Sequence, residues 1–93
     1  MTLTEDEARS FAYDDHPDYD EVETIIDYDV MYKDYAPATT ISKKLSDGTF
    51  WALDWDSYQS HYGSGESMFN SNELRQVKQI EKVITTKEWI NID

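Results

Sequence analysis

The sequence predicts an α+β fold, in which an antiparallel sheet of about four strands carries one or two helices packed on one face. Three observations support it: a helix-start signature near the N-terminus, several alternating or β-branched stretches, and an Asp-Gly turn between two of them. With 93 residues, 39% of them hydrophobic, the chain can bury one modest core. We therefore expect a single acidic domain over residues 1–93.

The first element is a short helix over residues 5–13. Thr4 and Glu7 have the spacing of a capping box, in which a hydroxyl and a carboxylate satisfy the first backbone N–H groups. The helix would face Ala8, Phe11 and Ala12 inward. Residues 14–20, which contain Pro17, would form the following loop.

The stretch from Asp14 to Asp34 carries the strongest functional signal. It holds nine of the 20 acidic residues against one base, Lys33. Its second half alternates, which predicts a first strand over residues 21–34. On such a strand Asp27 and Asp29 would lie roughly 6.6–6.8 Å apart on one face. That is about the interval between successive backbone phosphates.

The next two strands are predicted over residues 39–45 and 49–58, after a bend at 36–38. Asp47-Gly48 between them is a strong hairpin signal, with positive φ expected at both central turn positions. In the second of these strands one face would carry Trp51, Leu53 and Trp55.

The last third of the chain is predicted as a polar loop over 59–72, a helix over 73–82 and a strand over 83–90. The helix is predicted from an apolar stripe of helical spacing: Leu74, Val77, Ile80 and Ile84. A strand over 73–82 remains the alternative, although it would alternate poorly. Val83 to Ile90 is β-branched and aromatic, which favours a strand.

The negative charge is concentrated in the first third of the chain. Of the formal net charge of −12, residues 1–34 contribute −10, from twelve acids and two bases. Such a field repels nucleic acid and anionic membranes and attracts basic surfaces. We therefore expect no direct nucleic-acid binding and no membrane binding.

Nothing in the sequence points to catalysis. There is no cysteine, so disulfides and thiolate sites are excluded. His16 and His61 lie in polar stretches, and no phosphate-binding glycine loop occurs. We expect no enzyme activity, no cofactor and no specific metal site. Weak divalent-cation binding by the oxygen-rich 14–20 loop stays open, although the glycine and distal glutamate of a calcium-binding EF-hand are not in place.

A cytoplasmic location is expected. The first ten residues are acidic, where a signal peptide carries basic residues and an apolar segment. No apolar run approaches the ~18 residues that a membrane-spanning helix needs.

The charge layout resembles that of DNA-mimic inhibitors, a functional class rather than one family. The resemblance implies a small non-enzymatic protein that blocks a basic, nucleic-acid-binding surface of a partner, as anti-restriction and anti-CRISPR proteins encoded by phage do. Tyrosines among the acids would stack on the partner's arginines. The predicted contact residues are Tyr13, Asp14, Asp15, Asp18, Tyr19, Asp20, Glu21, Glu23, Asp27, Asp29 and Tyr35.

The alternative is an adaptor or assembly protein that binds its partner through surface aromatics and the loop over 59–72. The two functions differ in their expected response to salt, because only charge recognition weakens steeply with ionic strength. Either a monomer or a homodimer is compatible with the sequence.

Overall fold

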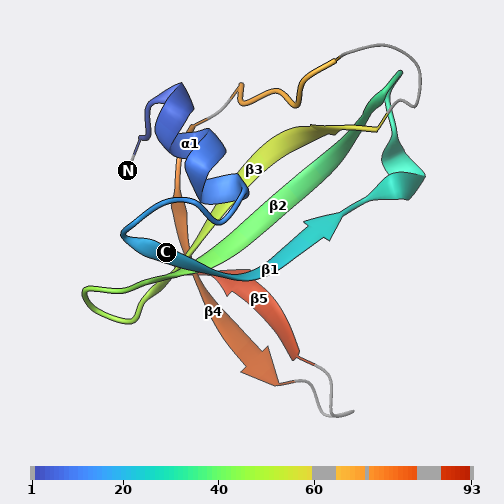
Figure 1. Cartoon of the computed structure of the whole chain (residues 1–93). Helices are drawn as coiled ribbons and strands as arrows, with labels where there is room; N and C mark the ends of the chain where they lie inside the picture. The colour runs from blue at the N-terminus through green and yellow to red at the C-terminus, as the bar shows by residue number, and fades with distance from the viewer. Residues whose placement is uncertain (1, 60–64, 71, 82–86, 93) are drawn as a thin grey trace.

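The computed structural model describes residues 2–59, 65–70, 72–81 and 87–92. They form a five-stranded antiparallel sheet with the strand order β1-β2-β3-β4-β5, and one short helix lies on it (Figure 1). The α+β class is confirmed, with five strands rather than four. The elements are α1 (Glu5–Ala12), β1 (Tyr19–Ile26), the 3-10 turn η1 (Tyr28–Val30), β2 (Tyr35–Lys44), β3 (Phe50–Tyr58), β4 (Arg75–Glu81) and β5 (Lys87–Asn91).

The helix α1 begins where the capping box predicts. The Thr4 hydroxyl accepts from the Glu7 N–H, and the Glu7 carboxylate accepts from the Thr4 N–H. The buried face of the helix is the predicted one, Ala8, Phe11 and Ala12. It covers one side of the sheet, where the larger core cluster lies. The other members of that cluster are Leu3, Tyr19, Ala38, Leu53, Trp55, Phe69 and Leu74.

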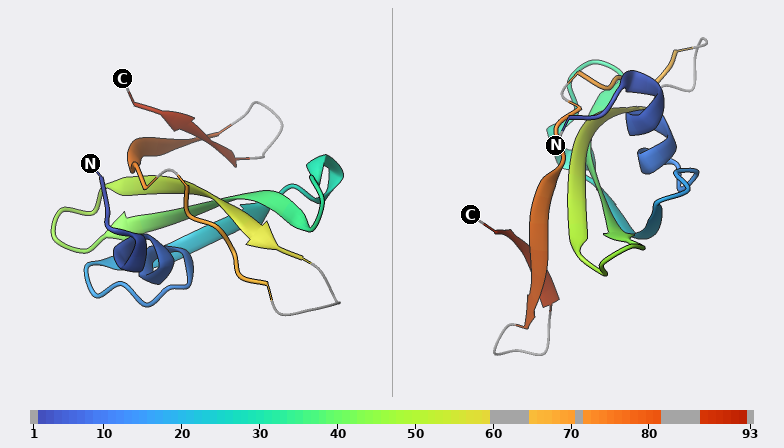
Figure 2. Two further views of the ribbon diagram at one scale, coloured as in Figure 1. Left: turned by 90° about the horizontal axis from the view of Figure 1, so that it is seen from above. Right: turned by 90° about the vertical axis from the view of Figure 1, so that its left-hand side faces the viewer.

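The sheet bends between β3 and β4. Only Phe50–Ala52 of β3 pair with β4, whereas nine residue pairs join β2 to β3. The β4–β5 hairpin therefore diverges from the first three strands, as the two views in Figure 2 show. A smaller apolar cluster of Ile41, Ala52 and Val77 lies on the face opposite α1, with Phe50 and Trp89 packed against it.

The helix predicted over 73–82 is wrong, because β4 occupies this segment. Leu74 and Val77 resemble one helical stripe in the sequence, but they belong to different core clusters of the folded protein. Residues 75–77 of β4 pair with β3 and residues 77–81 pair with β5, so every residue of β4 has a ladder partner on at least one side. Tertiary pairing thus overrides the local helical pattern.

The first strand is shorter than predicted. It ends at Ile26, and the chain then forms η1 and a two-residue turn at Lys33-Asp34, flanked by Tyr32 and Tyr35, whose backbones hydrogen-bond to each other. A β-bulge between Glu21 and Glu23 shifts the register, so the alternation predicted for the whole stretch does not hold across it.

The predicted bend at 36–38 is part of β2 instead. Pro37 has no N–H to donate, which normally keeps proline out of a central strand. Here β1 has already ended at Ile26, and the Asp27 N–H donates to the Pro37 carbonyl. On the other side Pro37 faces Asp56, whose backbone hydrogen bonds go to Met68. The lack of an N–H at Pro37 therefore removes no hydrogen bond from the sheet.

The Asp-Gly hairpin is confirmed, with a four-residue loop instead of a two-residue one. The Lys44 N–H donates to the Thr49 carbonyl, and the Gly48 N–H donates to the Lys44 carbonyl. Gly48 alone in this turn has positive φ, at 74°. The β3 face predicted to be buried is confirmed by Leu53 and Trp55, with Trp51 packed beside them.

The C-terminal strand is present as β5, and residues 83–86 of its predicted range lie outside the described residues. Residues 60–64 and 71 of the predicted loop also lie outside them. The helix in the described part of the chain is far too short and polar to cross a bilayer.

Candidate partner-binding surface

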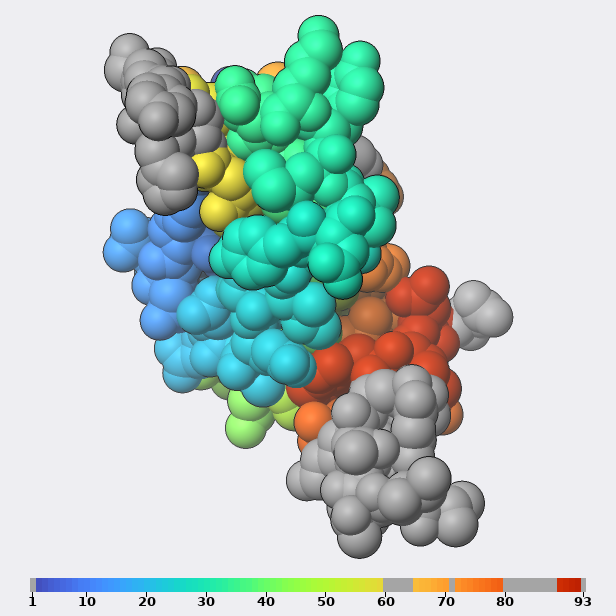
Figure 3. Space-filling view, turned by 90° about the vertical axis from the view of Figure 1, so that its right-hand side faces the viewer, coloured from blue at the N-terminus to red at the C-terminus, as the bar shows by residue number. Residues whose placement is uncertain are grey.

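The acidic stretch lies along one side of the molecule. In Figure 3 the end of α1, the 14–20 loop, β1 and the η1 region follow one another across a single face, from blue through cyan to teal. β1 is an edge strand of the described sheet, in which it pairs with β2 alone. Side chains of this stretch therefore meet solvent over most of its length.

All eight acids predicted as contact residues are exposed: Asp14, Asp15, Asp18, Asp20, Glu21, Glu23, Asp27 and Asp29. Four of these carboxylates also support the local fold. Asp14 Oδ1 accepts from the Glu21 N–H at 2.9 Å, Glu21 accepts from the Thr24 hydroxyl, and Glu23 Oε2 accepts from the Trp89 indole at 2.9 Å. Asp27 Oδ1 accepts from the Asp29 N–H at 3.1 Å.

None of the described cations forms an ion pair with this surface. Among the described residues, the side-chain ion pairs are Arg9–Glu5, at 3.7 Å, and Arg75–Asp54. Neither involves any of the eight acids. The carboxylates of Asp15, Asp18 and Asp20 have no hydrogen bond or ion pair within the described parts of the chain, and all three residues are exposed.

The predicted strand spacing of Asp27 and Asp29 is wrong. Asp27 is the N-cap of η1, and Asp29 lies inside that turn. An aspartate that follows a strand often binds the N–H two residues ahead, which begins a turn instead of extending the strand. Both side chains remain exposed, but their distance is not that of two strand positions on one face.

The three predicted tyrosine anchors differ in their exposure. Tyr13 is 48% exposed and contacts Trp55 and Phe69 edge-on. Tyr35 is half-buried against the ring of Tyr58. Tyr19 is only 5% exposed and packs edge-on against Phe11 in the core. Burial raises the pKa of the Tyr19 hydroxyl, and this ring is not available to stack on a partner.

Sequence reasoning missed an apolar part of the same surface. These large side chains are between 44% and 74% exposed: Val22, Ile25, Tyr28, Val30, Met31 and Tyr32. They lie on β1 and in the η1 region before the Lys33-Asp34 turn. The prediction of a long strand hid them, because it placed four of the six on the core face. An Asp-Tyr-Asp-Val sequence directly after a strand was the signal that a turn begins there.

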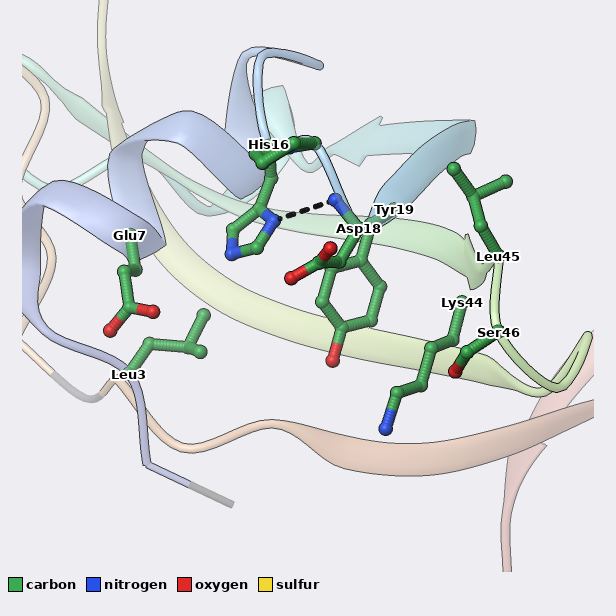
Figure 4. A pocket seen from close by; sticks show the side chains of 9 residues that line it. Leu3, Glu7, His16, Asp18, Tyr19, Lys44, Leu45 and Ser46 are labelled. Atoms are coloured by element: carbon green, nitrogen blue, oxygen red, sulfur yellow. Dashed lines mark hydrogen bonds between the residues drawn. The ribbon is translucent and has the colours of Figure 1, made fainter.

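A cavity of about 610 Å³ lies between the start of α1, the 14–20 loop and the end of β2 (Figure 4). Its charged and polar side chains include Glu7, His16, Asp18 and Lys44. His16 Nδ1 accepts from the Asp18 N–H at 3.1 Å, which favours the proton on Nε2. Glu7 is held by the helix cap. The His16 hydrogen bond thus shapes the 14–20 loop, and the Glu7 hydrogen bond belongs to the start of the helix.

A smaller cavity of about 340 Å³ lies on the opposite face, between β1–β3 and the β4–β5 hairpin. Its floor is Ile41, Ala52 and Val77, and its walls include Glu23 and Trp89. The hydrogen bond from Trp89 to Glu23 joins the two edge strands of the sheet across this cleft.

The described residues bring no three His, Asp or Glu side chains close enough to hold a metal ion. The acids of the 14–20 loop point instead to separate partners or to solvent. Asp14, for example, binds the Glu21 N–H.

Comparison of the chain with protein-family models, with curated proteins and with solved structures finds no match.

Proposed function

We propose that this protein is a small, non-enzymatic inhibitor that binds a basic, nucleic-acid-binding surface of another protein and acts from the cytoplasm. The observation that carries the proposal is the acidic side of the molecule. Eight exposed carboxylates follow one another over the 14–20 loop, β1 and η1, and no described cation pairs with them. Inhibitors of the anti-restriction or anti-CRISPR type work by such charge mimicry.

Charge physics supports this use. Like charges so close in the chain repel one another and oppose folding, so an unpaired acidic surface is costly without a function. A groove that neutralises phosphates attracts such a surface over a long range, which raises the association rate. The exposed apolar residues of the η1 region, such as Met31 and Tyr32, would add contact energy once the surfaces meet.

The test is capture of partners from a cell lysate by the immobilised protein at low and at moderate salt, read by mass spectrometry. The informative variant combines Asp20→Asn and Asp29→Asn, which removes two exposed charges and leaves the Asp14 and Asp27 hydrogen bonds intact. We expect captured nucleic-acid-binding proteins to decrease with salt and with this variant.

The matched control combines Asp6→Asn and Glu66→Gln, which removes the same charge from exposed positions outside the acidic stretch. It should capture almost as much as the unmodified protein. Equal losses from both double variants would mean that only net charge matters, and the proposed surface would then be wrong.

An adaptor or assembly role is the second candidate, and the exposed side chains of Tyr28, Val30, Met31 and Tyr32 favour it. In that case Tyr32→Ser should abolish capture, while salt should change it little. The part of the 59–72 loop that is described is partly held to the body. Phe69 is buried, and Met68 pairs with Asp56.

A further inference from the structure

The cleft between β1 and β5 has the features of a site for one cationic side chain. An apolar floor of Ile41, Ala52 and Val77 lies at the bottom, and the indole of Trp89 forms a wall. Its volume of about 340 Å³ falls at the lower end of the range of about 300–1,000 Å³ that small-ligand pockets occupy. A long, narrow, partly apolar group fits such a space better than a bulky one.

The charges at the rim favour a cation over an anion. Arg75 is already neutralised, since its guanidinium pairs with Asp54 and its Nε donates to Asn91 Oδ1 at 3.0 Å. Glu23 has no cationic partner among the described residues. Only its Oε2 is engaged, by the Trp89 indole at 2.9 Å, so Oε1 can accept from an incoming donor.

Trp89 is held in a fixed orientation beside this carboxylate. Its ring centroid lies 5.0 Å from that of Phe50, and its N–H is bound to Glu23. An aromatic face beside an unpaired carboxylate recognises planar cations, because the ring quadrupole and the negative charge attract the same group. Arginine adds an aliphatic stem, which would lie along the apolar floor.

We propose that this cleft binds one arginine side chain of the basic partner, with the guanidinium against the face of the Trp89 ring and hydrogen-bonded to Glu23 Oε1. The source of that arginine rests on the proposed function, but the site is testable with a small cation alone. The probe is n-butylguanidinium, which carries the head group and the stem of arginine without a peptide.

Three indole N–H resonances in the ¹H–¹⁵N spectrum report the outcome, because each tryptophan has a different acceptor. Trp51 donates to Thr49, Trp55 to Thr40 and Trp89 to Glu23. At constant ionic strength, n-butylguanidinium should shift the Trp89 resonance in a saturable manner and leave the other two in place. Pentanamide, which is uncharged, and pentanoate, which is anionic, should not produce this shift.

Glu23→Gln is the decisive variant. The amide oxygen can still accept from Trp89, and Glu23 is exposed, so the fold should persist and the dispersion of the spectrum will show it. Loss of a charge-assisted contact should weaken n-butylguanidinium binding about tenfold or more. Glu66→Gln, at an exposed position outside both the cleft and the acidic stretch, should bind as the unmodified protein does.

Four results would overturn the proposal: no movement of Trp89, an equal response to pentanamide, a response to pentanoate, or unchanged affinity in Glu23→Gln. None of these would disprove the proposed function, which is tested separately by the Asp20 and Asp29 variant. Conversely, saturable binding of the cation would stand even if lysate capture proved insensitive to the acidic surface.

Discussion

Lys33 shows at the scale of one residue how the acidic stretch reverses direction. Its φ is 57°, a left-handed conformation that costs a residue with a Cβ roughly 1–2 kcal/mol. Asp14 has φ 59° after the helix, but aspartate tolerates this region and its carboxylate binds the Glu21 N–H there. Strain is therefore expected mainly at Lys33.

Lys33→Gly should raise the free energy of unfolding by about 0.5–1 kcal/mol, because relief of the left-handed strain exceeds the added freedom of the unfolded chain. Urea unfolding measures the change. Lys78→Gly removes the same charge from an exposed strand position and should lower stability. If both substitutions destabilise equally, the Lys33 conformation is not strained.

Thr4→Ala should lower the free energy of unfolding by about 1 kcal/mol, since the helix loses its N-cap. Ser10→Ala, inside the same helix, is the control and should change stability much less. Urea unfolding of both variants at pH 7 makes the comparison. Similar losses would show that the cap contributes nothing specific.

The same helix cap makes the free energy of unfolding depend on pH. Hydrogen bonds from the Thr4 backbone and hydroxyl hold the pKa of Glu7 below its usual range. A carboxyl whose pKa is lower in the folded state stabilises the fold above its unfolded pKa, about 4.3, and this contribution is lost as the pH falls through the folded value. In Thr4→Ala, NMR titration should show the Glu7 pKa returning toward its usual value.

Among the elements, β2 and β3 depend on a buried hydroxyl. The indole N–H of Trp55 donates to Thr40 Oγ1 at 3.0 Å, and Thr40 is fully buried. Helix α1 and β3 meet over this part of the core, so the pair helps to hold the layers together. Removal of the acceptor leaves a buried donor without a partner.

Thr40→Val should therefore destabilise the protein by about 1–3 kcal/mol, although valine matches threonine in shape and strand preference. Thr39→Val is the control on the other face, where the hydroxyl binds the exposed carboxylate of Asp54, and it should cost less than about 0.5 kcal/mol. Equal effects in thermal unfolding would contradict a special role for the Trp55 bond.

For the whole molecule, self-repulsion of the acidic side should be visible in the stability. The net charge is −12, and residues 1–34 contribute most of it. Screening by added salt should raise the melting temperature, because it weakens repulsion between the exposed carboxylates. The variant that combines Asp20→Asn and Asp29→Asn should have a higher melting temperature at low salt, and added salt should raise that temperature less. A lower melting temperature in this variant would mean that the carboxylates of Asp20 and Asp29 make stabilising interactions in the folded protein.

The sequence was sufficient for features that depend on neighbours in the chain. The capping box at Thr4 and Glu7, the inward face of α1 and the Gly48 hairpin all follow from side chains that act on adjacent backbone groups. The alternation of Trp51, Leu53 and Trp55 was equally readable, since this strand face packs on the larger core cluster. The concentration of acid in residues 14–34 needed only the sequence.

The other features of the fold depend on contacts between segments that are far apart in the sequence. β4 is a strand because its first residues pair with β3 and its later residues pair with β5, and its helical stripe could not show that. The bulge between Glu21 and Glu23 depends on the register with β2, and the burial of Tyr19 depends on where α1 packs. The cleft of Glu23 and Trp89 joins residues 66 positions apart, so only the curvature of the folded sheet brings them together.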